Sequence, residues 1–364
     1  MADTFQPLVR LLQAEFKFNL SRIKCLVLLI EGLISARTVN LAELSASMSG
    51  VAKVGSHYTR LRRFMQEVRF DWAPLARLLA SLSGIMNEEK WTLALDRTNW
   101  MLGKIHINIL YLSVAYKNIA IPILWVFLED KNRGNSDHFD RIDLLECFIK
   151  TFGKARIEVL LGDREFIGKE WLDWLESAEI KYIFRLKENG QYISNSRGVM
   201  VRINELLRPL KNGETISLGV RKVGKLQKQP YPVTALRNKH GELVVVIHSA
   251  AIKNPLHTYK KRWEIETMFK AFKSSGFNME ATHMTDPERL NTLFSVMAIA
   301  FCITYKAGII VVETEPIPLK SHGRRARSIL RTGLDALQNL LANLSLKYNQ
   351  FKNLLENILA VHYL

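Results

Sequence analysis

Cysteine is scarce in this chain of 364 residues. Cys25, Cys147 and Cys302 are the only cysteines, and they lie far apart without a CxxC pair. Structural zinc sites and disulfide frameworks are built from closely spaced or paired cysteines, so neither is indicated. A reducing compartment fits this usage, and we expect the protein in the cytoplasm.

Several common catalytic signatures are also missing. Gly-Lys occurs four times but is never followed by Ser or Thr, so the sequence has no Walker A loop for a nucleotide phosphate. It contains neither HExxH, which would indicate a zinc protease, nor GxSxG, which would indicate an α/β-hydrolase.

Long uninterrupted apolar runs are lacking too. The run from Cys25 to Ile34 is broken by Glu31, and the run from Leu293 to Val312 is interrupted by Lys306. A membrane-spanning helix needs about 20 consecutive apolar residues. We interpret both runs as buried helices and expect no membrane span and no secretory signal.

Positive charge is plentiful. Lys and Arg number 51 against 35 Asp and Glu, which gives a formal net charge of +16, and 48% of the residues are hydrophobic. The chain can therefore bury substantial cores, in one large or two to three smaller domains. Its basic surface is suited to a phosphate backbone.

The first 85 residues or so are predicted to be helical. Asn40 and Ser56 are candidate N-caps, and two helices around "SGVAKVG" would resemble a helix-turn-helix. The second of these helices presents Arg60, Arg62 and Arg63, which could contact duplex DNA. An ordinary amphipathic helix with a basic outer face explains the same residues equally well.

From Trp91 the pattern changes to strands rich in β-branched and aromatic residues. Three strands are followed by an alternation of helix and strand, which predicts a mixed α/β sheet. The predicted strands cover 91–96, 105–116, 119–129, 157–163 and 181–187, and the predicted helices cover 138–152 and 169–178.

Residues 188 to about 249 interrupt this alternation with short strand-like pieces. The stretch from Lys181 to Ala250 contains thirteen Lys or Arg against four Glu. We interpret it as a basic, β-rich insertion. Further on, four arginines fall within the eight residues from Arg324 to Arg331, and a helical tail follows.

The segment "HTYKKRWEIETMFKAFKSSGF", residues 257–277, is predicted to be one helix with two different faces. At about 100° per residue, one stripe within about 60° carries four polar residues, and Lys270 joins it. A separate apolar arc faces a core. The stripe consists of Tyr259, Arg262, Glu266 and Lys273, and the arc of Ile265, Met268, Phe269 and Phe272. A plain surface ion pair between Arg262 and Glu266 is the alternative.

Two aspartates stand where strands end. Asp96 closes or interrupts the strand "WTLALDRTNW", and Asp163 ends "VLLGDREF". Each could be a simple turn or cap residue. Together with Glu266, however, they would form a set of three carboxylates on two strands and one helix, which is what two hard divalent cations require.

These motifs resemble those of a known family. The pattern Y-x2-R-x3-E-x6-K at Tyr259, Arg262, Glu266 and Lys273 resembles the YREK signature of bacterial insertion-sequence DDE transposases, specifically insertion sequence family four. "LDRTNW" and "GDREF" are similar to that family's first and second catalytic Asp motifs. The order agrees, with 67 positions from Asp96 to Asp163 and 103 from Asp163 to Glu266. The resemblance covers roughly residues 90 to 340.

The resemblance implies an RNase H-like fold in which Asp96, Asp163 and Glu266 are catalytic and hold two Mg²⁺ or Mn²⁺ ions. Tyr259, Arg262 and Lys273, with Lys270 beside them, would grip phosphates of the transposon end. The implied partners are double-stranded DNA, with terminal inverted repeats and target DNA, and a second copy of the chain in a paired-end complex. ATP is not needed, and the protein would work at the bacterial nucleoid.

The same resemblance gives a domain plan for an α/β protein flanked by helical regions. Relatives hold a flipped base on an aromatic residue of the insertion, where this chain has no Trp and offers Tyr192 or Tyr231. The expected parts are an end-binding region at 1–88, a catalytic core at 89–187 and 250–310, a β-rich insertion at 188–249, and a helical C-terminal region at 311–364.

The function expected from these motifs is cut-and-paste excision and integration of an insertion sequence. Two alternatives remain open. One is a nuclease or resolvase on the same fold, which would hydrolyse DNA without strand transfer. The other is a non-catalytic DNA-binding regulator or a transposase relic, against which the intact Asp96, Asp163 and Glu266 argue.

Overall fold

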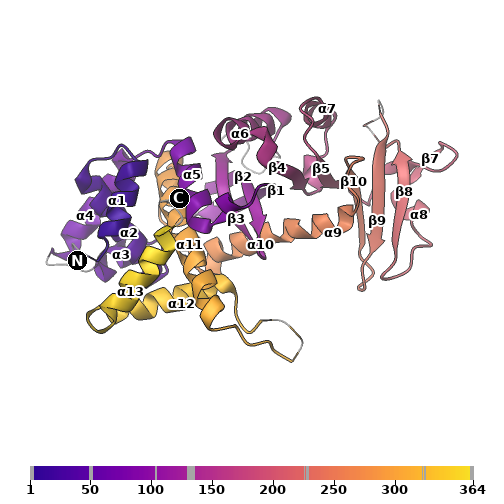
Figure 1. Ribbon diagram of the computed structural model, residues 1–364. Helices are drawn as coiled ribbons and strands as arrows, with labels where there is room; N and C mark the ends of the chain where they lie inside the picture. The colour runs from indigo at the N-terminus through magenta and orange to yellow at the C-terminus, as the bar shows by residue number, and fades with distance from the viewer. Residues whose placement is uncertain are drawn as a thin grey trace.

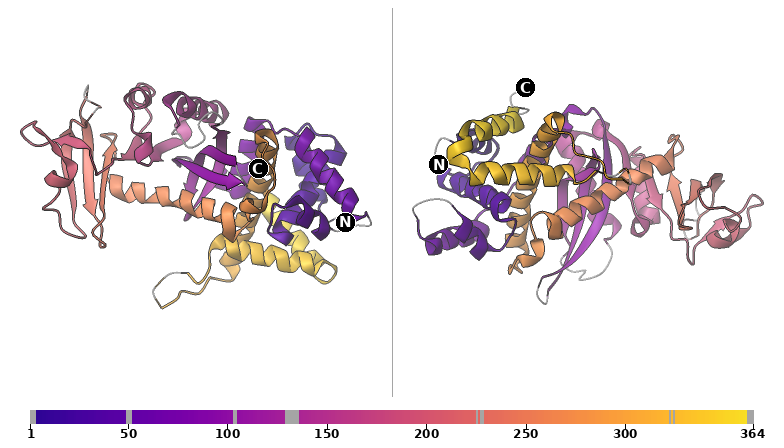
Figure 2. Two further views of the ribbon diagram at one scale, coloured as in Figure 1. Left: turned by 180° about the vertical axis from the view of Figure 1, so that it is seen from behind. Right: turned by 90° about the horizontal axis from the view of Figure 1, so that it is seen from below.

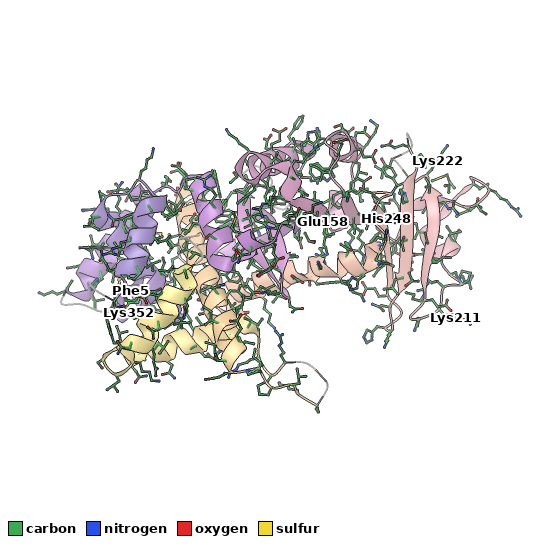
Figure 3. All side chains as sticks on the ribbon, viewed as in Figure 1. Phe5, Glu158, Lys211, Lys222, His248 and Lys352 are labelled. Atoms are coloured by element: carbon green, nitrogen blue, oxygen red, sulfur yellow. The ribbon has the colours of Figure 1, made fainter. Side chains whose placement is uncertain are left out.

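The protein is elongated, with a central sheet between a helical end and a β-rich end (Figure 1). The computed structural model describes residues 4–48, 52–102, 105–128, 136–224, 226, 229–321, 323 and 325–360. Figure 2 shows the N-terminal helices and the β-rich insertion at opposite ends of the molecule in both further views. Labelled side chains follow the same division, with Phe5 and Lys352 at one end and Lys211 and Lys222 at the other (Figure 3).

Five helices form the N-terminal region, as predicted. They are α1 Gln6–Glu15, α2 Leu20–Ala36, α3 Leu41–Ser47, α4 Val54–Glu67 and α5 Trp72–Ser83. Asn40 caps α3 by accepting a hydrogen bond from the backbone of Ala42. The prediction that Ser56 is an N-cap was wrong, because α4 already begins at Val54 and its N-cap is Lys53. Residues 49–51 of the expected helix-turn-helix lie outside the described residues.

The central sheet has eight strands in the order β3-β2-β1-β4-β5-β10-β9-β8. β1 Trp91–Leu102, β2 Ile105–Tyr116 and β3 Ile119–Phe127 form an antiparallel meander, while β4 Ile157–Gly162 runs parallel to β1, and β5 Tyr182–Arg185 parallel to β4. This mixed arrangement is an RNase H-like core, so the predicted fold class is confirmed. Asp96 does not end its strand, because β1 continues to pair with β2 as far as Leu102.

Helices cover both faces of the sheet. α6 His138–Phe152 and α7 Lys169–Ser177 lie above it in the view of Figure 1, and α9 Pro255–Tyr259 and α10 Trp263–Lys270 lie below. α6 starts with a capping box between Asp137 and Asp140. On the other side α10 packs against β1, β2 and β3.

The insertion is part of the same sheet. β10 Leu243–His248 pairs antiparallel with β5, and β9 Tyr231–Arg237 and β8 Thr215–Arg221 follow outward. All six residues of β10 are buried, which is typical of a strand covered on both faces. A short hairpin, β6 Tyr192–Ser194 with β7 Met200–Arg202, and the short helix α8 Ile203–Leu206 lie beside these strands.

The predicted helix 257–277 is not regular. It consists of α9 Pro255–Tyr259, a 3₁₀ turn Lys260–Arg262, α10 Trp263–Lys270 and a π turn Ala271–Ser275. A 3₁₀ turn holds fewer and a π turn more residues than an α turn. The regular spacing on which the polar stripe was predicted therefore does not extend through the whole segment. The apolar arc is confirmed, since Ile265, Met268 and Phe272 are buried and Phe269 packs against the core.

Three helices complete the chain: α11 Pro287–Thr314, α12 Ile329–Ala342 and α13 Leu344–Leu359. Among the described helices, α11 alone is long and apolar enough by itself to cross a membrane, and α2 with α3 would qualify only as a pair bent by 94°. The most apolar 18-residue window of α11 is 72% buried within the protein, so α11 is a core helix, as predicted. α2 also buries most of its run from Cys25 to Ile34.

Two glycines allow α11 and α12 to cross closely. A Cβ atom on Gly333 would lie 2.0 Å from the carbonyl oxygen of Thr304 and 2.5 Å from the backbone nitrogen of Gly308. A Cβ atom on Gly308 would lie 2.1 Å from the carbonyl oxygen of Ile329. Backbone atoms cannot move aside as a flexible side chain can, so this contact requires glycine on both helices.

We predict that Gly333→Ala lowers the free energy of unfolding by about 1–3 kcal/mol, since overpacking forces the two helices apart. Gly55→Ala in α4 is the matched control, because nothing lies within 4 Å of its Cβ position. Alanine is also the better helix former there. Denaturant unfolding of both variants measures the difference, and equal stabilities would contradict the close crossing.

Candidate catalytic site

Asp96 lies in the middle of β1 with both carboxylate oxygens engaged. Oδ1 accepts the backbone N–H of Arg97 at 2.8 Å, and Oδ2 accepts Nη1 of Arg262 at 2.9 Å. The side chain is only 14% exposed. A carboxylate this far from water needs a positive partner, which Arg262 supplies.

Arg262 connects the strand to the helix. Its Nη2 donates to Oε1 of Glu266 at 2.6 Å while Nη1 donates to Asp96. The Arg262 side chain is 9% exposed, so this is not the plain surface ion pair of the alternative interpretation. Glu266 is different, with a side chain that is 53% exposed. One buried guanidinium therefore brings together two of the three predicted carboxylates.

The register of the sheet places Asp163 beside Asp96. β1 and β4 are parallel, and Leu95 pairs with Gly162, so the two aspartates are the next residues on neighbouring strands. Asp163 also caps the following 3₁₀ turn, Arg164–Phe166, because its Oδ1 accepts the backbone N–H of Glu165 at 2.9 Å. It is thus a cap residue as well as a neighbour of Asp96.

Charge is concentrated at this point. The pKa of the Asp96 carboxyl is raised to about 7, mainly by burial and in smaller part by the neighbouring charges of Asp163 and Glu165. Arg262 and the Arg97 N–H oppose this rise. The shift mainly reflects the cost of keeping an ionised carboxylate away from water, and the like charges of Asp163 and Glu165 add to it.

The three carboxylates fit a divalent metal in chemistry, since oxygen donors suit Mg²⁺ and Mn²⁺. Their arrangement is more open than a finished metal site. Among the residues that the structure describes, no group of three or more His, Cys, Asp and Glu side chains converges as metal ligands do. Asp96 and Asp163 are neighbours, whereas Glu266 is held by Arg262 at the edge of the site.

A second buried ion pair, which sequence reasoning missed, supports the Asp163 turn. Nε of Arg97 lies 3.1 Å from both carboxylate oxygens of Glu165, and the two side chains are 12% and 14% exposed. Arg97 also donates to Asn108 on β2 at 3.1 Å. Arg97 one position after the first aspartate, in "LDR", and Glu165 two positions after the second, in "GDRE", are the sequence signal that could have revealed it.

Arg141 of α6, also missed, supports the same turn from the helix layer. It is buried, donates from Nε to the Ser136 hydroxyl at 2.9 Å, and lies 5.0 Å from the ring centre of Phe166. Its Nη2 reaches the Glu165 carbonyl oxygen at 3.4 Å. The turn that follows β4 is therefore fixed by side chains from β1 and α6.

The other residues of the predicted stripe differ in burial and in their contacts. Tyr259 is buried, with its ring in a small cluster that includes Val159 and Leu161, and its pKa is raised to about 12 mainly by burial. Lys270 is exposed. Lys273 is half-buried, with Nζ 5.9 Å from the ring centre of Trp100. In this arrangement Tyr259 does not face solvent.

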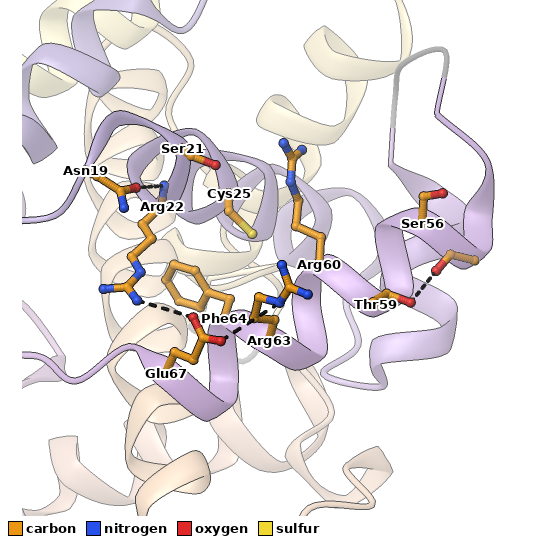
Figure 4. A pocket seen from close by; sticks show the side chains of 11 residues that line it. Asn19, Ser21, Arg22, Cys25, Ser56, Thr59, Arg60, Arg63, Phe64 and Glu67 are labelled. Atoms are coloured by element: carbon orange, nitrogen blue, oxygen red, sulfur yellow. Dashed lines mark hydrogen bonds and ion pairs between the residues drawn. The ribbon is translucent and has the colours of Figure 1, made fainter.

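The three arginines of α4 also diverge. Arg60 and Arg63 line a groove of about 720 Å³ between α4 and the start of α2, together with Arg22 (Figure 4). Glu67 lies there too, 3.3 Å from Arg22 and 3.9 Å from Arg63. Arg62 instead lines a separate groove beside α3 and the start of α11.

Of the two insertion tyrosines, Tyr192 is available to a ligand and Tyr231 is not. Tyr231 is 1% exposed, whereas Tyr192 is 43% exposed. Tyr192 lines a groove of about 810 Å³ that extends to Arg164 and Glu165, next to Asp163.

Comparison with known proteins identifies the family. The sequence profile of the transposase DDE domain family matches residues 88–303, which is more than half of the chain and includes all three carboxylates. The chain belongs to this family and is a DNA transposase. A solved piggyBac transposase synaptic complex with hairpin DNA is similar, with 13% identity, a TM-score of 0.45, and coverage of 94% of this chain and 76% of that chain. No curated protein matches.

We predict that Glu165→Ala lowers the free energy of unfolding by about 3–5 kcal/mol, because the buried charge of Arg97 would lose the carboxylate of Glu165. Glu356→Ala is the control: its ion pair with Lys352 is half-exposed, at 3.9 Å, and exposed pairs contribute less than about 1 kcal/mol. Denaturant unfolding measures both. If the two variants lose the same stability, the Arg97–Glu165 pair does not hold the turn.

Proposed function

We propose that the protein is the cut-and-paste transposase of an insertion sequence, with a YREK-type active site. It would cut DNA at terminal inverted repeats and join the freed ends to target DNA. The observation that carries the proposal is the Arg262 bridge. Residues from three separate motifs, on β1, after β4 and on α10, meet at one buried guanidinium and the strand beside it.

Asp96, Asp163 and Glu266 would hold two Mg²⁺ or Mn²⁺ ions. When bound, such ions activate an attacking oxygen and stabilise the leaving oxygen of a phosphodiester. The protein's part is to present the carboxylates on rigid elements, which β1 and the fixed turn after β4 do. Glu266 is half-exposed, and among the described residues its ion-pair partner is Arg262, so it can exchange this partner for a cation.

Phosphate binding near the cut is assigned to cations of the α10 segment. Arg262 is fixed beside Asp96, and Lys270 and Lys273 follow along the same segment. A guanidinium can hold a phosphate with two parallel hydrogen bonds. Tyr259 contacts Arg262 through its ring, since the guanidinium carbon lies 5.9 Å from the tyrosine ring centre.

The remaining parts would handle recognition. Residues 1–88, with Arg60, Arg62 and Arg63, would bind the transposon end; residues 188–249 would cover DNA near the cut, with Tyr192 as the accessible aromatic residue. Residues 89–187 and 250–310 would be the catalytic core, and 311–364 a helical C-terminal region. The protein would act without ATP as a homodimer on paired ends at the bacterial nucleoid.

We predict that Asp96→Ala, Asp163→Ala and Glu266→Ala each abolish cleavage while binding of the DNA end stays nearly intact. The carboxylates act on the chemistry, whereas basic surfaces dominate affinity. The assay uses a plasmid with the element's own inverted repeats, with and without Mg²⁺, and follows excised linear DNA and joined product.

Glu280→Ala is the control for these three variants, because Glu280 is an exposed carboxylate outside the site. Mg²⁺-dependent cleavage that survives any one of the three substitutions removes that residue from the catalytic set. Excised DNA without joined product from the unmodified protein would favour a nuclease, and neither product would favour a DNA-binding regulator.

We predict that Arg262→Ala slows cleavage and joining at least 100-fold and weakens end binding far less. A misplaced phosphate or carboxylate costs rate, because the reacting groups must be held within tenths of an ångström. Single-turnover reactions on pre-cut and uncut ends measure this. Lys352→Ala, which removes a cation from an exposed pair four residues apart, is the matched control. Near-normal rates with Arg262→Ala would show that the bridge is only structural.

A further inference from the structure

A basic groove lies beside α10, at the base of the segment 315–328 that joins α11 to α12 and is called the arm below. Its volume is about 560 Å³, and its wall includes Lys117 and Asn118 of the turn between β2 and β3, Thr267 of α10, Tyr305 of α11, and Arg325 and Arg327 of the arm. The arm projects from the body below α10 in Figure 1. Four segments far apart in the sequence therefore meet at this groove.

The charge on the wall has one sign. Lys117, Arg325 and Arg327 are exposed, and none of the described residues that line the groove is acidic. Asp335 lies behind the arm, 2.7 Å from Arg331 and 3.6 Å from Arg327. Among the described residues, Lys117 and Arg325 have no carboxylate within ion-pair distance. These two cations are thus available to an external anion.

The floor of the groove is rigid. Tyr305 is buried and donates its hydroxyl hydrogen to the carbonyl oxygen of Tyr116 at 3.1 Å, which fixes the end of β2. Lys117 and Asn118 both have positive φ angles, as a tight two-residue hairpin turn requires. The turn therefore presents Lys117 at a fixed place.

The groove has a defined distance from the catalytic site. Asp96 pairs with Tyr111, and Lys117 follows six positions later, directly after the end of β2. At about 3.3 Å per residue this corresponds to about 20 Å. Nucleotides in a DNA strand are spaced by about 3.4 Å along the helix axis, so the interval matches about six nucleotides.

We propose that this groove binds backbone phosphates of the DNA held at the catalytic site, about six nucleotides from the cut. The proposal rests on the proposed function. Cations that contact phosphates fix the register of a duplex without reading its sequence. A second copy of this chain, with a formal net charge of +16, is a poor occupant for a groove of the same sign.

The test compares the unmodified protein with one double variant that carries both Lys117→Gln and Arg325→Gln. Both residues are exposed, so the fold should persist, which thermal unfolding checks. The probe is a DNA fragment with the element's own end. The slope of log K against log salt concentration is negative. We expect its magnitude to decrease by about two, since each lost phosphate contact removes about 0.9. We also expect hydroxyl-radical protection to disappear at one cluster about six nucleotides from the cut.

Lys347→Gln with Lys352→Gln is the control, because it removes the same charge from α13, which is not assigned to DNA binding, and should leave the footprint unchanged. If the groove variant keeps the slope and footprint of the unmodified protein, and the unmodified protein cuts normally, the groove does not bind DNA phosphates. The proposed function would still stand. A changed oligomer mass with an unchanged footprint would assign the groove to a second copy and overturn it too. Failure of the unmodified protein to cut or join would instead count against the proposed function.

Discussion

A single buried cation determines how the two halves of the catalytic domain meet. Arg262 is separated from Asp96 by 166 positions, and its guanidinium is the direct link between β1 and the α10 segment. A buried charge without a partner costs several kcal/mol, so Arg262 and Asp96 hold each other in place. The irregular backbone before α10 serves this contact, because the 3₁₀ turn places Arg262 against the strand and leaves Glu266 near solvent.

The sheet provides the second constraint. Parallel pairing of β1 with β4 places Asp96 and Asp163 on neighbouring strands, and the Arg97–Glu165 pair fixes the turn after β4 from the opposite direction. The site is thus held by two ion pairs, one on each side of the aspartates. A rigid frame of this kind suits chemistry that depends on position, because carboxylates on strands move less than carboxylates on loops.

Much of the core could be predicted from the sequence. The helix 138–152 and the strand 105–116 have the predicted bounds, because strong local periodicity and short turns define them. The insertion was recognised as β-rich, but its union with the main sheet was not, because pairing of β10 with β5 depends on contacts distant in sequence. The 3₁₀ and π turns were missed because residue periodicity assumes a regular helix. The separation of Arg62 from Arg60 and Arg63 could have been predicted, because at about 100° per residue Arg62 lies on a different face of α4.

The central claim is that Asp96, Asp163 and Glu266 share one metal site, and metal-directed backbone cleavage tests it without relying on turnover. Fe²⁺ in place of Mg²⁺, with ascorbate and peroxide, produces hydroxyl radicals that cut the polypeptide next to the bound ion. With the DNA end bound, we predict cuts clustered beside residues 96, 163 and 266, suppressed by excess Mg²⁺. Cuts beside residues 96 and 163 but not 266, or cuts elsewhere that Mg²⁺ does not suppress, would contradict the shared site.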